Sequence, residues 1–368
     1  MTVAAAATGD RGPSEDSAMP TAAPPLAMTT AAPPLAVTMG EPAGIGGDIT
    51  LAAFAGQTSG QLPALPPFFV IDDAARLRAL AQRLGLVVTV TEIAAPEEAV
   101  AVFPHALPVL PQPLAAAVEP GRPDPANAAA VLAAIERAVG LTRAGRAGGV
   151  VTNPINKAVL KAAGFRHPGH TEFLAELAGG VTPVMMLACP QLRVVPVTIH
   201  LSLREAVASL RTETIVELGR LTAAGLRDSF GIARPRLAVA ALNPHAGEGG
   251  VMGREEIDII APAVAQLQAD GIDAFGPTPT DTLFHPAARA RFDAALCMTH
   301  DHALIPLKTI DFAGGVNVTL GLPFVRTSPD HGTAFDIAGS GAADCTSLVA
   351  ALRMAADMAE ARRRSAAP

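Results

Sequence analysis

The sequence of 368 residues contains no tryptophan and no tyrosine, so its large aromatic rings are limited to 13 phenylalanines. So few rings argue against a base-stacking platform for nucleic acid. The net charge of −7, the pI near 5.7 and the lack of a Lys/Arg cluster argue against a nucleic-acid surface of any kind. No run approaches the roughly 18 uninterrupted apolar residues of a membrane helix. We therefore expect a soluble protein whose partner is a small molecule.

Cysteine is also scarce. Cys189, Cys297 and Cys345 lie far apart in apolar surroundings, which predicts free thiols rather than a disulfide framework. None of the three follows a glycine elbow or has an evident base beside it, so a cysteine nucleophile is not expected. This usage favours a reducing compartment and a cytoplasmic protein.

The N-terminal segment differs in composition from the rest of the chain. Residues 1–34 are mostly Ala, Pro, Thr and Gly, which predicts a disordered tail without the features of a secretory signal. From Leu35 onward, strand, loop and helix patterns alternate, with strand candidates at Phe68–Ile71, Val87–Val90, Gly149–Thr152, Val184–Leu187 and Val316–Leu320. Such alternation indicates an α/β fold with helices on both faces of a sheet, and the length suits two lobes.

Three histidines each end a short apolar run: Arg193–His200, Leu237–His245 and Ala294–His300. Runs of this kind indicate buried parallel strands, and open α/β sheets bind ligands at the carboxyl ends of their strands. A lone histidine after a strand is more often structural, but three in the same position predict a metal site. Three ligands leave one position open for substrate, which is the catalytic arrangement.

Several loops carry groups suited to anions. The glycine loop of residues 40–47 precedes a helix pattern, and is either a ligand cradle or a structural turn. Thr171 is expected to cap a helix over residues 173–177, which is either a plain capped helix or a site where free N–H groups and His170 meet a phosphate. Lys157, near the start of another helix, can pair with a phosphate or stabilise a developing oxyanion.

The C-terminal third holds further candidates. Lys308, Asn317 and Arg326 supply two cations and an amide, fit for a phosphate and a carboxylate. Asp281 and Asp301 can orient metal-bound imidazoles or transfer protons, although either can also be a helix cap or a surface charge.

The loop from His331 to Gly339 reads HGTAFDIAG and looks like the adenosine-binding loop of isopropylmalate and isocitrate dehydrogenases. Those enzymes bind NAD without a Rossmann fingerprint, and this chain has none. The resemblance implies that the cofactor contacts His331, Gly332, Thr333 and Asp336. Asp336 would accept hydrogen bonds from the adenosine ribose, and its carboxylate would repel a 2′-phosphate, so NAD is expected rather than NADP.

Taken together, the motifs resemble one closer family, the 4-hydroxythreonine-4-phosphate dehydrogenases of vitamin B6 biosynthesis. The resemblance spans residues 35 to about 360 and rests on these segments: Gly40–Gly46, Gly169–Glu172, His200, Asn243–Gly250, Asp281–Phe284, His300–Lys308 and Gly315–Gly339. It implies an isopropylmalate dehydrogenase-like α/β fold of two lobes, 35–150 plus 310–362 and 151–309, with the active-site crevice between them. It also implies a homodimer with active sites at the subunit interface.

The family's site residues can be carried over position by position. The metal ligands fall on His200, His245 and His300, and the substrate contacts fall on His170, Thr171, Lys308, Asn317 and Arg326. The candidates for proton transfer are Asp281, Asp301 and Lys157. One departure is Thr299-His300-Asp301-His302, where the family usually has Tyr-His-Asp-Gln.

The implied reaction is NAD-dependent oxidation of 4-phosphohydroxy-L-threonine, followed by loss of CO₂ to give 3-amino-2-oxopropyl phosphate. A divalent ion, Zn²⁺, Mg²⁺ or Co²⁺, would assist it. A related dehydrogenase of 4-phospho-erythronate or 4-phospho-threonate is the nearer alternative. The farther one is a zinc hydrolase or another non-dehydrogenase that binds metal and phosphate.

Overall fold

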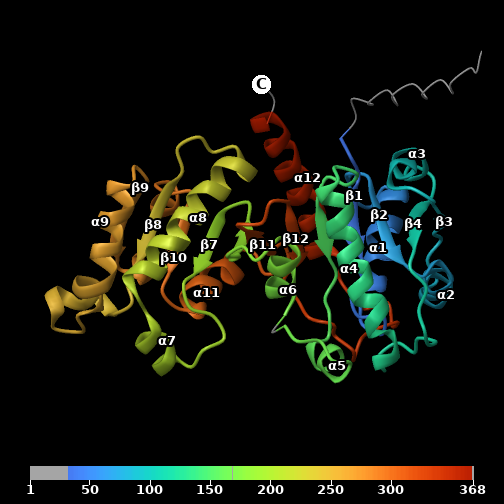
Figure 1. The fold of residues 1–368 in the computed structure, drawn as a ribbon, viewed down its shortest axis with the longest axis horizontal. Helices are drawn as coiled ribbons and strands as arrows, with labels where there is room; N and C mark the ends of the chain where they lie inside the picture. The colour runs from blue at the N-terminus through green and yellow to red at the C-terminus, as the bar shows by residue number, and fades with distance from the viewer. Residues whose placement is uncertain (1–31, 168, 367–368) are drawn as a thin grey trace, which may run out of the picture. The chain divides into compact units, whose positions relative to one another are not determined.

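A single sheet of twelve strands organises the chain in the computed structural model, which describes residues 32–167 and 169–366 (Figure 1). The strand order is β3-β4-β2-β1-β5-β12-β11-β6-β7-β10-β8-β9. The strands are β1 Leu35–Thr38, β2 Phe68–Asp72, β3 Val90–Glu92, β4 Leu107–Pro111, β5 Val150–Thr152, β6 Val184–Cys189, β7 Leu192–Pro196, β8 Arg236–Ala240, β9 Asp273–Thr278, β10 Ala294–Cys297, β11 Val316–Leu320 and β12 Arg326–Pro329. The predicted tail lies almost wholly outside the described residues.

Helices connect the strands. The α-helices are α1 Gly46–Thr58, α2 Ala74–Leu84, α3 Ala99–Val102, α4 Ala128–Arg143, α5 Lys157–Ala162, α6 His170–Leu177, α7 Leu203–Ser209, α8 Thr212–Phe230, α9 Ala261–Ala269, α10 Pro286–Arg289, α11 His300–Ile310 and α12 Thr346–Ala366. Short turns of other helix types are η1 Pro96–Glu98, η2 Pro125–Asn127, η3 Pro244–Gly250, η4 Glu256–Ile260 and η5 Thr280–Thr282. Among the helices of the described ranges, none has the length and apolarity needed to cross a bilayer.

Local sequence explains where these elements begin and end. α2 starts after Asp73, whose carboxylate accepts the N–H of Arg76, and it stops at Gly85 in a left-handed conformation. α7 has a full capping box between Ser202 and Glu205. The strand predicted at residues 87–90 is wrong except for its last residue, because Val87 is 96% exposed and only Val90 enters β3.

The three strands that precede the histidines are neighbours in the sheet. β10 pairs in parallel with β7 on one side and with β8 on the other, as predicted for a shared carboxyl edge. The strands are shorter than the apolar runs, so His200 and His245 lie in loops beyond β7 and β8, and His300 is the first residue of α11.

The last two strands of the chain lie in the middle of the sheet. β12 pairs in parallel with β5, and β11 pairs antiparallel with both β12 and β6. Residues near 320 therefore join strands formed by the first 152 residues to strands formed by residues 184–297. The sheet continues across the boundaries of the two predicted lobes, whose limits stay a prediction.

Candidate active site

One cavity of about 350 Å³ collects many of the predicted site residues. We call it the anion cavity. Residues from the end of β5, the start of α6, the start of α11, and β11 and β12 with the loop that follows line it. The predicted residues among them are Lys157, His170, Thr171, His200, His300, Asn317, Arg326, His331 and Gly332.

Arg326, the first residue of β12, is the most deeply buried cation of this cavity, with 3% of its surface exposed. Its Nη2 donates to Thr152 Oγ1 at 2.7 Å, and its Nη1 donates to Thr319 Oγ1 at 2.9 Å and to Asn317 Oδ1 at 3.4 Å. These partners are neutral, and among the described residues Nε has no partner at all. Burial lowers the pKa of Arg326 to about 10. A buried cation without a carboxylate is an anion site, because burying a charge is costly unless it is paired.

His170 lies opposite this cation at the start of α6. Its Nε2 is buried and has no hydrogen-bond partner among the described residues. Burial, and after it the charges of Arg326 and Lys157, hold the pKa of His170 well below its usual value. The imidazole is therefore neutral and free to donate to an oxyanion.

The expected cap of α6 is wrong in one detail. Gly169 occupies the N-cap position and His170 and Thr171 are the first two helical residues, so the hydroxyl of Thr171 does not cap the helix. The first N–H groups of α6 remain without side-chain partners at this end. Thr171 still lines the cavity, as the phosphate hypothesis requires.

Two of the predicted metal ligands lie together at the rim. The ring centroids of His200 and His300 are 6.4 Å apart, and both side chains also line a neighbouring cavity of about 220 Å³. Asp301 Oδ1 lies 2.8 Å from Nδ1 of His300, which leaves Nε2 of that ring for a ligand. We call His200, His300 and Asp301 the histidine edge.

His245 does not join them. It lies in η3, exposed to solvent, and lines neither of these cavities. Within the ranges that the structure describes, no three His, Cys, Asp or Glu side chains gather closely enough to hold a metal ion. A single chain thus brings two of the three predicted histidines together.

The remaining predicted residues occupy different places. Lys308 reaches the anion cavity indirectly, because its Nζ pairs at 2.6 Å with Asp330, which lines the cavity. Asp281 lies in η5, exposed, and lines neither cavity. Asp301 lines only the smaller one.

The 331–339 loop runs from one cavity to another. His331 and Gly332 line the anion cavity. At the far end, Gly339 N donates to Asp48 at 2.7 Å, and Gly339 O accepts from Nε of Arg83 at 2.9 Å. Asp48 and Arg83 line a cavity of about 600 Å³, whose other walls are largely apolar. Asp336 lies between these ends and is exposed.

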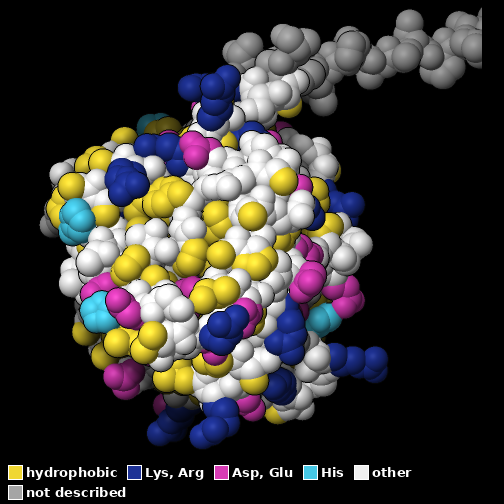
Figure 2. Space-filling view, turned by 90° about the vertical axis from the view of Figure 1, so that its left-hand side faces the viewer, with side chains coloured by type: hydrophobic (Ala, Val, Ile, Leu, Met, Phe, Trp, Pro, Cys, Tyr) yellow, Lys and Arg dark blue, Asp and Glu magenta, His cyan; other side chains and the backbone are white. Residues whose placement is uncertain are grey.

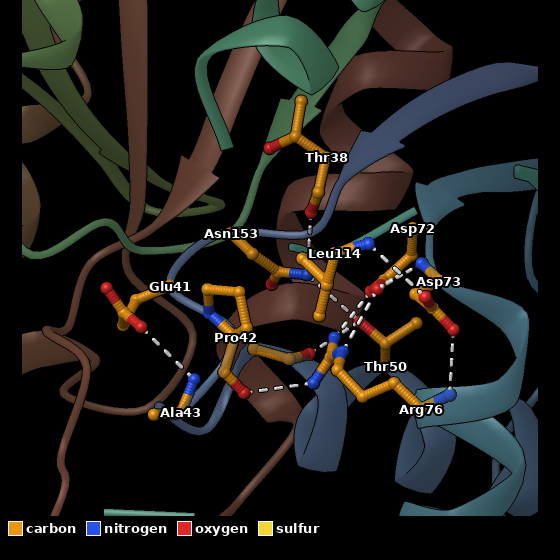
Figure 3. A network of polar contacts seen from close by, with 11 residues as sticks. Thr38, Glu41, Pro42, Ala43, Thr50, Asp72, Asp73, Arg76, Leu114 and Asn153 are labelled. Atoms are coloured by element: carbon orange, nitrogen blue, oxygen red, sulfur yellow. Dashed lines mark hydrogen bonds and ion pairs between the residues drawn. The ribbon is translucent and has the colours of Figure 1, made fainter. Parts of the chain in front are cut away.

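The glycine loop is held by a network that the sequence reasoning missed (Figure 3). Arg76 donates to both carboxylate oxygens of Asp72 and to Pro42 O at 3.0 Å. Asn153 Nδ2 donates to Thr38 O and to the hydroxyl of Thr50. The sequence signal for this network was Asp72 at a strand end, four residues before Arg76, a spacing that brings two side chains together. The glycine loop also meets the 331–339 loop, since Ile45 N donates to Thr333 O at 3.0 Å.

Known proteins resemble the chain over most of its length. Residues 64–355 match the family described as pyridoxal phosphate biosynthetic protein PdxA. A 4-hydroxythreonine-4-phosphate dehydrogenase from Bradyrhizobium diazoefficiens is 56% identical over 336 residues, which covers 88% of this chain and 96% of the relative. One from Caulobacter vibrioides is 55% identical over 329 residues, with coverage of 88% and 96%. The crystal structure of a 4-hydroxythreonine-4-phosphate dehydrogenase from Klebsiella pneumoniae aligns with a TM-score of 0.80 at 38% identity, covering 89% of this chain and 99% of that one. The predicted α/β fold class is confirmed.

Proposed function

The chain belongs to the PdxA family of pyridoxal phosphate biosynthesis and is an oxidoreductase, and from this premise we propose its substrate, cofactor and site. The proposed reaction is NAD-dependent oxidation of 4-phosphohydroxy-L-threonine, with decarboxylation to 3-amino-2-oxopropyl phosphate. The unpaired cation of Arg326 beside the neutral His170, next to two histidines at the rim, is the observation that supports it most. This pairing suits a small molecule with anionic ends and a hydroxyl between them.

The charged ends of the substrate have several donors available. Arg326 offers its free Nε–H, His170 its Nε2, and Lys157 its ammonium group, and all three line one cavity. We assign the phosphate to the α6 end, because free helix N–H groups and a nearby cation are a common phosphate site. Asn317 and Thr171 complete the proposed substrate contacts. Lys308 holds Asp330 against the same wall through their ion pair.

The donor set fits a divalent ion. Imidazole nitrogens suit Zn²⁺ and Co²⁺ better than Mg²⁺, which prefers oxygen ligands. His200 and His300 would hold the ion, and the carboxylate of Asp301 orients the His300 ring in the way second-shell carboxylates do. When bound, the ion would polarise the substrate hydroxyl and the ketone that forms from it.

We propose that a second copy of the chain supplies the third imidazole, His245, in a homodimer. The segments that follow His200, His245 and His300 in the chain carry exposed apolar side chains: Leu201, Leu203, Val207, Val251, Met252, Ile257, Ile305 and Phe312. Large exposed apolar side chains of this kind are typical of surfaces that another chain covers. Figure 2 shows the face of the molecule on which β9 and α9 lie, where hydrophobic and histidine side chains lie among charged ones.

The proposed cofactor position follows the 331–339 loop. This loop links the anion cavity, at His331, to the larger cavity at Asp48 and Arg83, so a dinucleotide lying along it would span both. The exposed carboxylate of Asp336 is then available to the ribose hydroxyls and would repel a 2′-phosphate.

Three residues are candidates for proton transfer, and one of them, Lys157, lines the anion cavity itself. Asp301 is committed to His300, and Asp281 would need the second copy or the substrate to bring it near. We place the reaction in the cytoplasm, since Cys189, Cys297 and Cys345 are all free thiols.

The direct test is NADH formation by the purified, metal-loaded protein. We expect turnover of 4-phosphohydroxy-L-threonine that a chelator abolishes and that Zn²⁺ or Co²⁺ restores. 4-Phospho-D-erythronate, assayed beside it, serves as the comparison. Turnover of the erythronate alone would move the enzyme to sugar-acid metabolism, and no reduction of NAD with either compound would refute the proposal.

A further inference from the structure

The loop that carries His245 has an unfavourable backbone. Five consecutive residues, His245 to Gly249, have positive φ values between 43° and 77°, and three of them are not glycine. L-residues rarely adopt this left-handed conformation, and a run of them is rarer still. Such a turn persists only where surrounding contacts hold it.

Glu256 provides those contacts. Its Oε1 accepts the backbone N–H of Leu242 at 2.8 Å and of Asn243 at 2.7 Å, and its Oε2 accepts Asn243 Nδ2 at 2.9 Å. The side chain is almost fully buried, with 3% of the residue exposed. Burial would raise the pKa of Glu256, but the hydrogen bonds from Asn243 and Leu242 outweigh it and lower the pKa, so the carboxylate is ionised.

The turn lies directly against this carboxylate. A Cβ placed on Gly247 would lie 2.7 Å from Oε2 of Glu256, so Gly247 leaves room for the carboxylate under the turn. Gly253 approaches Asn243 in the same way, since a Cβ placed on it would clash with Nδ2 of Asn243. The neighbouring Glu255 accepts from the same Nδ2 at 2.7 Å. The side-chain hydrogen bonds that hold Leu242 and Asn243 therefore converge on Glu256, with one further bond to Glu255, while Gly247 O accepts from Met252 N at 3.0 Å at the other end of the segment.

We propose that Glu256 is a positioning residue that sets the left-handed turn so that the imidazole of His245 is presented outward, ready to bind a metal ion. This inference rests on the proposed role of His245 as a ligand. A ligand whose backbone is already in place loses less entropy when the ion binds, so Glu256 acts on metal affinity. Outer residues of this kind contribute about 10- to 100-fold to metal affinity.

Glu256→Gln is the informative substitution. Both carboxylate oxygens accept hydrogen bonds from N–H groups, so the new amide must turn its own N–H₂ toward a donor in either orientation. Glu255→Gln is the matched control, because it removes a charge beside the same Asn243 while its amide oxygen can still accept from Nδ2, and the backbone bonds to Glu256 stay intact.

The experiment uses the full-length protein and titrates the metal-free form with Co²⁺ and Zn²⁺, with amide hydrogen exchange followed over residues 242–250. We expect Glu256→Gln to weaken metal binding 10- to 100-fold, to speed exchange in that segment and to leave kcat at saturating metal unchanged. Glu255→Gln should change metal affinity less than about threefold. If Glu256→Gln fails to fold, Gly247→Ala displaces the same carboxylate and is expected to weaken metal binding in the same way.

Wild-type metal affinity in folded Glu256→Gln would overturn the inference and leave the proposed function standing. Wild-type affinity in His245→Ala would instead overturn the proposed role of His245 itself. Loss of affinity in Glu255→Gln equal to that in Glu256→Gln would also overturn the inference, because the backbone contacts would then be irrelevant.

Discussion

The anion cavity and the histidine edge are built in opposite ways. The anion cavity is lined by residues of one chain, where Arg326 is fixed by three neutral partners and its buried Nε has no partner among the described residues. The histidine edge offers two imidazoles, a carboxylate and a margin of exposed apolar side chains. Under the proposed function, the first region would recognise the substrate within one chain, and the second would need His245 of a second copy to complete its metal site.

This difference separates binding from chemistry. A monomer with an intact anion cavity should still recognise phosphate and carboxylate groups. Metal binding, and turnover with it, should depend on the second copy. The two functions can therefore be lost independently, and the following variants are chosen to separate them.

The largest expected effect comes from mixing two inactive variants. His245→Ala and His300→Ala should each lose metal and turnover, by about 1,000-fold or more. In a mixed dimer, one site would combine His200 and His300 of one copy with His245 of the other. Random mixing makes half of the dimers mixed and half of their sites intact, so about a quarter of wild-type activity should return. NADH formation after subunit exchange measures it.

His302→Ala is the control for this pair, because His302 lies on the same helix but lines neither cavity. It should keep its metal and its activity. A mixture that stays inactive would contradict the proposal that a second copy supplies His245 to the histidine edge.

Arg326→Gln should affect the other region alone. Loss of a buried cation that binds an anion costs about 3 kcal/mol, or roughly 100-fold in kcat/KM. Metal affinity, measured by titration, should stay at the wild-type value. Thr319→Val, which removes one of the neutral partners, should cost about tenfold or less. Equal losses of metal and substrate binding in Arg326→Gln would mean that the regions are not separable.

Leu203→Asp tests whether a second copy of the chain covers the histidine edge in a dimer. Leu203 is 68% exposed at the start of α7, where an acidic residue does not weaken the helix. Burial of a new charge at an interface should weaken the dimer by about 2 kcal/mol, or roughly 30-fold, as measured by analytical ultracentrifugation. Val87→Asp, at a residue 96% exposed and distant in sequence, is the control and should leave the dimer unchanged. A stable dimer in both variants would place the interface elsewhere.

Asp336→Ala addresses the cofactor, which we expect to lie along the 331–339 loop, from the anion cavity to the cavity at Asp48 and Arg83. Removal of the carboxylate should raise the relative use of NADP by about tenfold, or roughly 1.4 kcal/mol. The ratio of kcat/KM for NAD and NADP reports it. An unchanged ratio would refute the assigned role of Asp336.

The smallest expected effect is a pH dependence of stability from His170. The lowered pKa means that the folded state resists protonation, whereas the unfolded chain binds a proton near pH 6.5. Below that pH the unfolded state binds more protons, so the free energy of unfolding falls as the pH falls through 6.5. Urea unfolding of His170→Gln beside the wild type, between pH 5 and pH 8, measures the difference. Equal slopes in both proteins would contradict the prediction.

The sequence predicted the parts of the fold that follow from short-range pattern. The apolar runs before the three histidines became adjacent parallel strands, because buried strands leave a continuous hydrophobic signal. The run at residues 87–90 gave the same signal, yet Val87 is exposed, because tertiary contacts and not propensity decide which apolar residues pair. Pairing of β11 with β6 depends on contacts across more than a hundred residues, which no local pattern encodes.

For the site, residue type was more informative than position. Arg326, His170 and His200 were named from their chemistry and all line one cavity. Their partners Thr152 and Thr319 were not named, because a threonine in a strand is an ordinary β-former until the fold brings an arginine to it. The position of His245 could not be predicted from the sequence either, since it depends on a left-handed turn and on Glu256.

The central position of β11 and β12 has a consequence for synthesis of the chain. When the ribosome has made the first 300 residues, β5 and β6 each still lack a neighbour, so two strand edges stand open. Open edges template pairing with other chains, and partly made proteins are prone to it. The sheet can close only once residues 316–329 have emerged, so a message truncated shortly before that point would yield an aggregating product rather than a smaller enzyme.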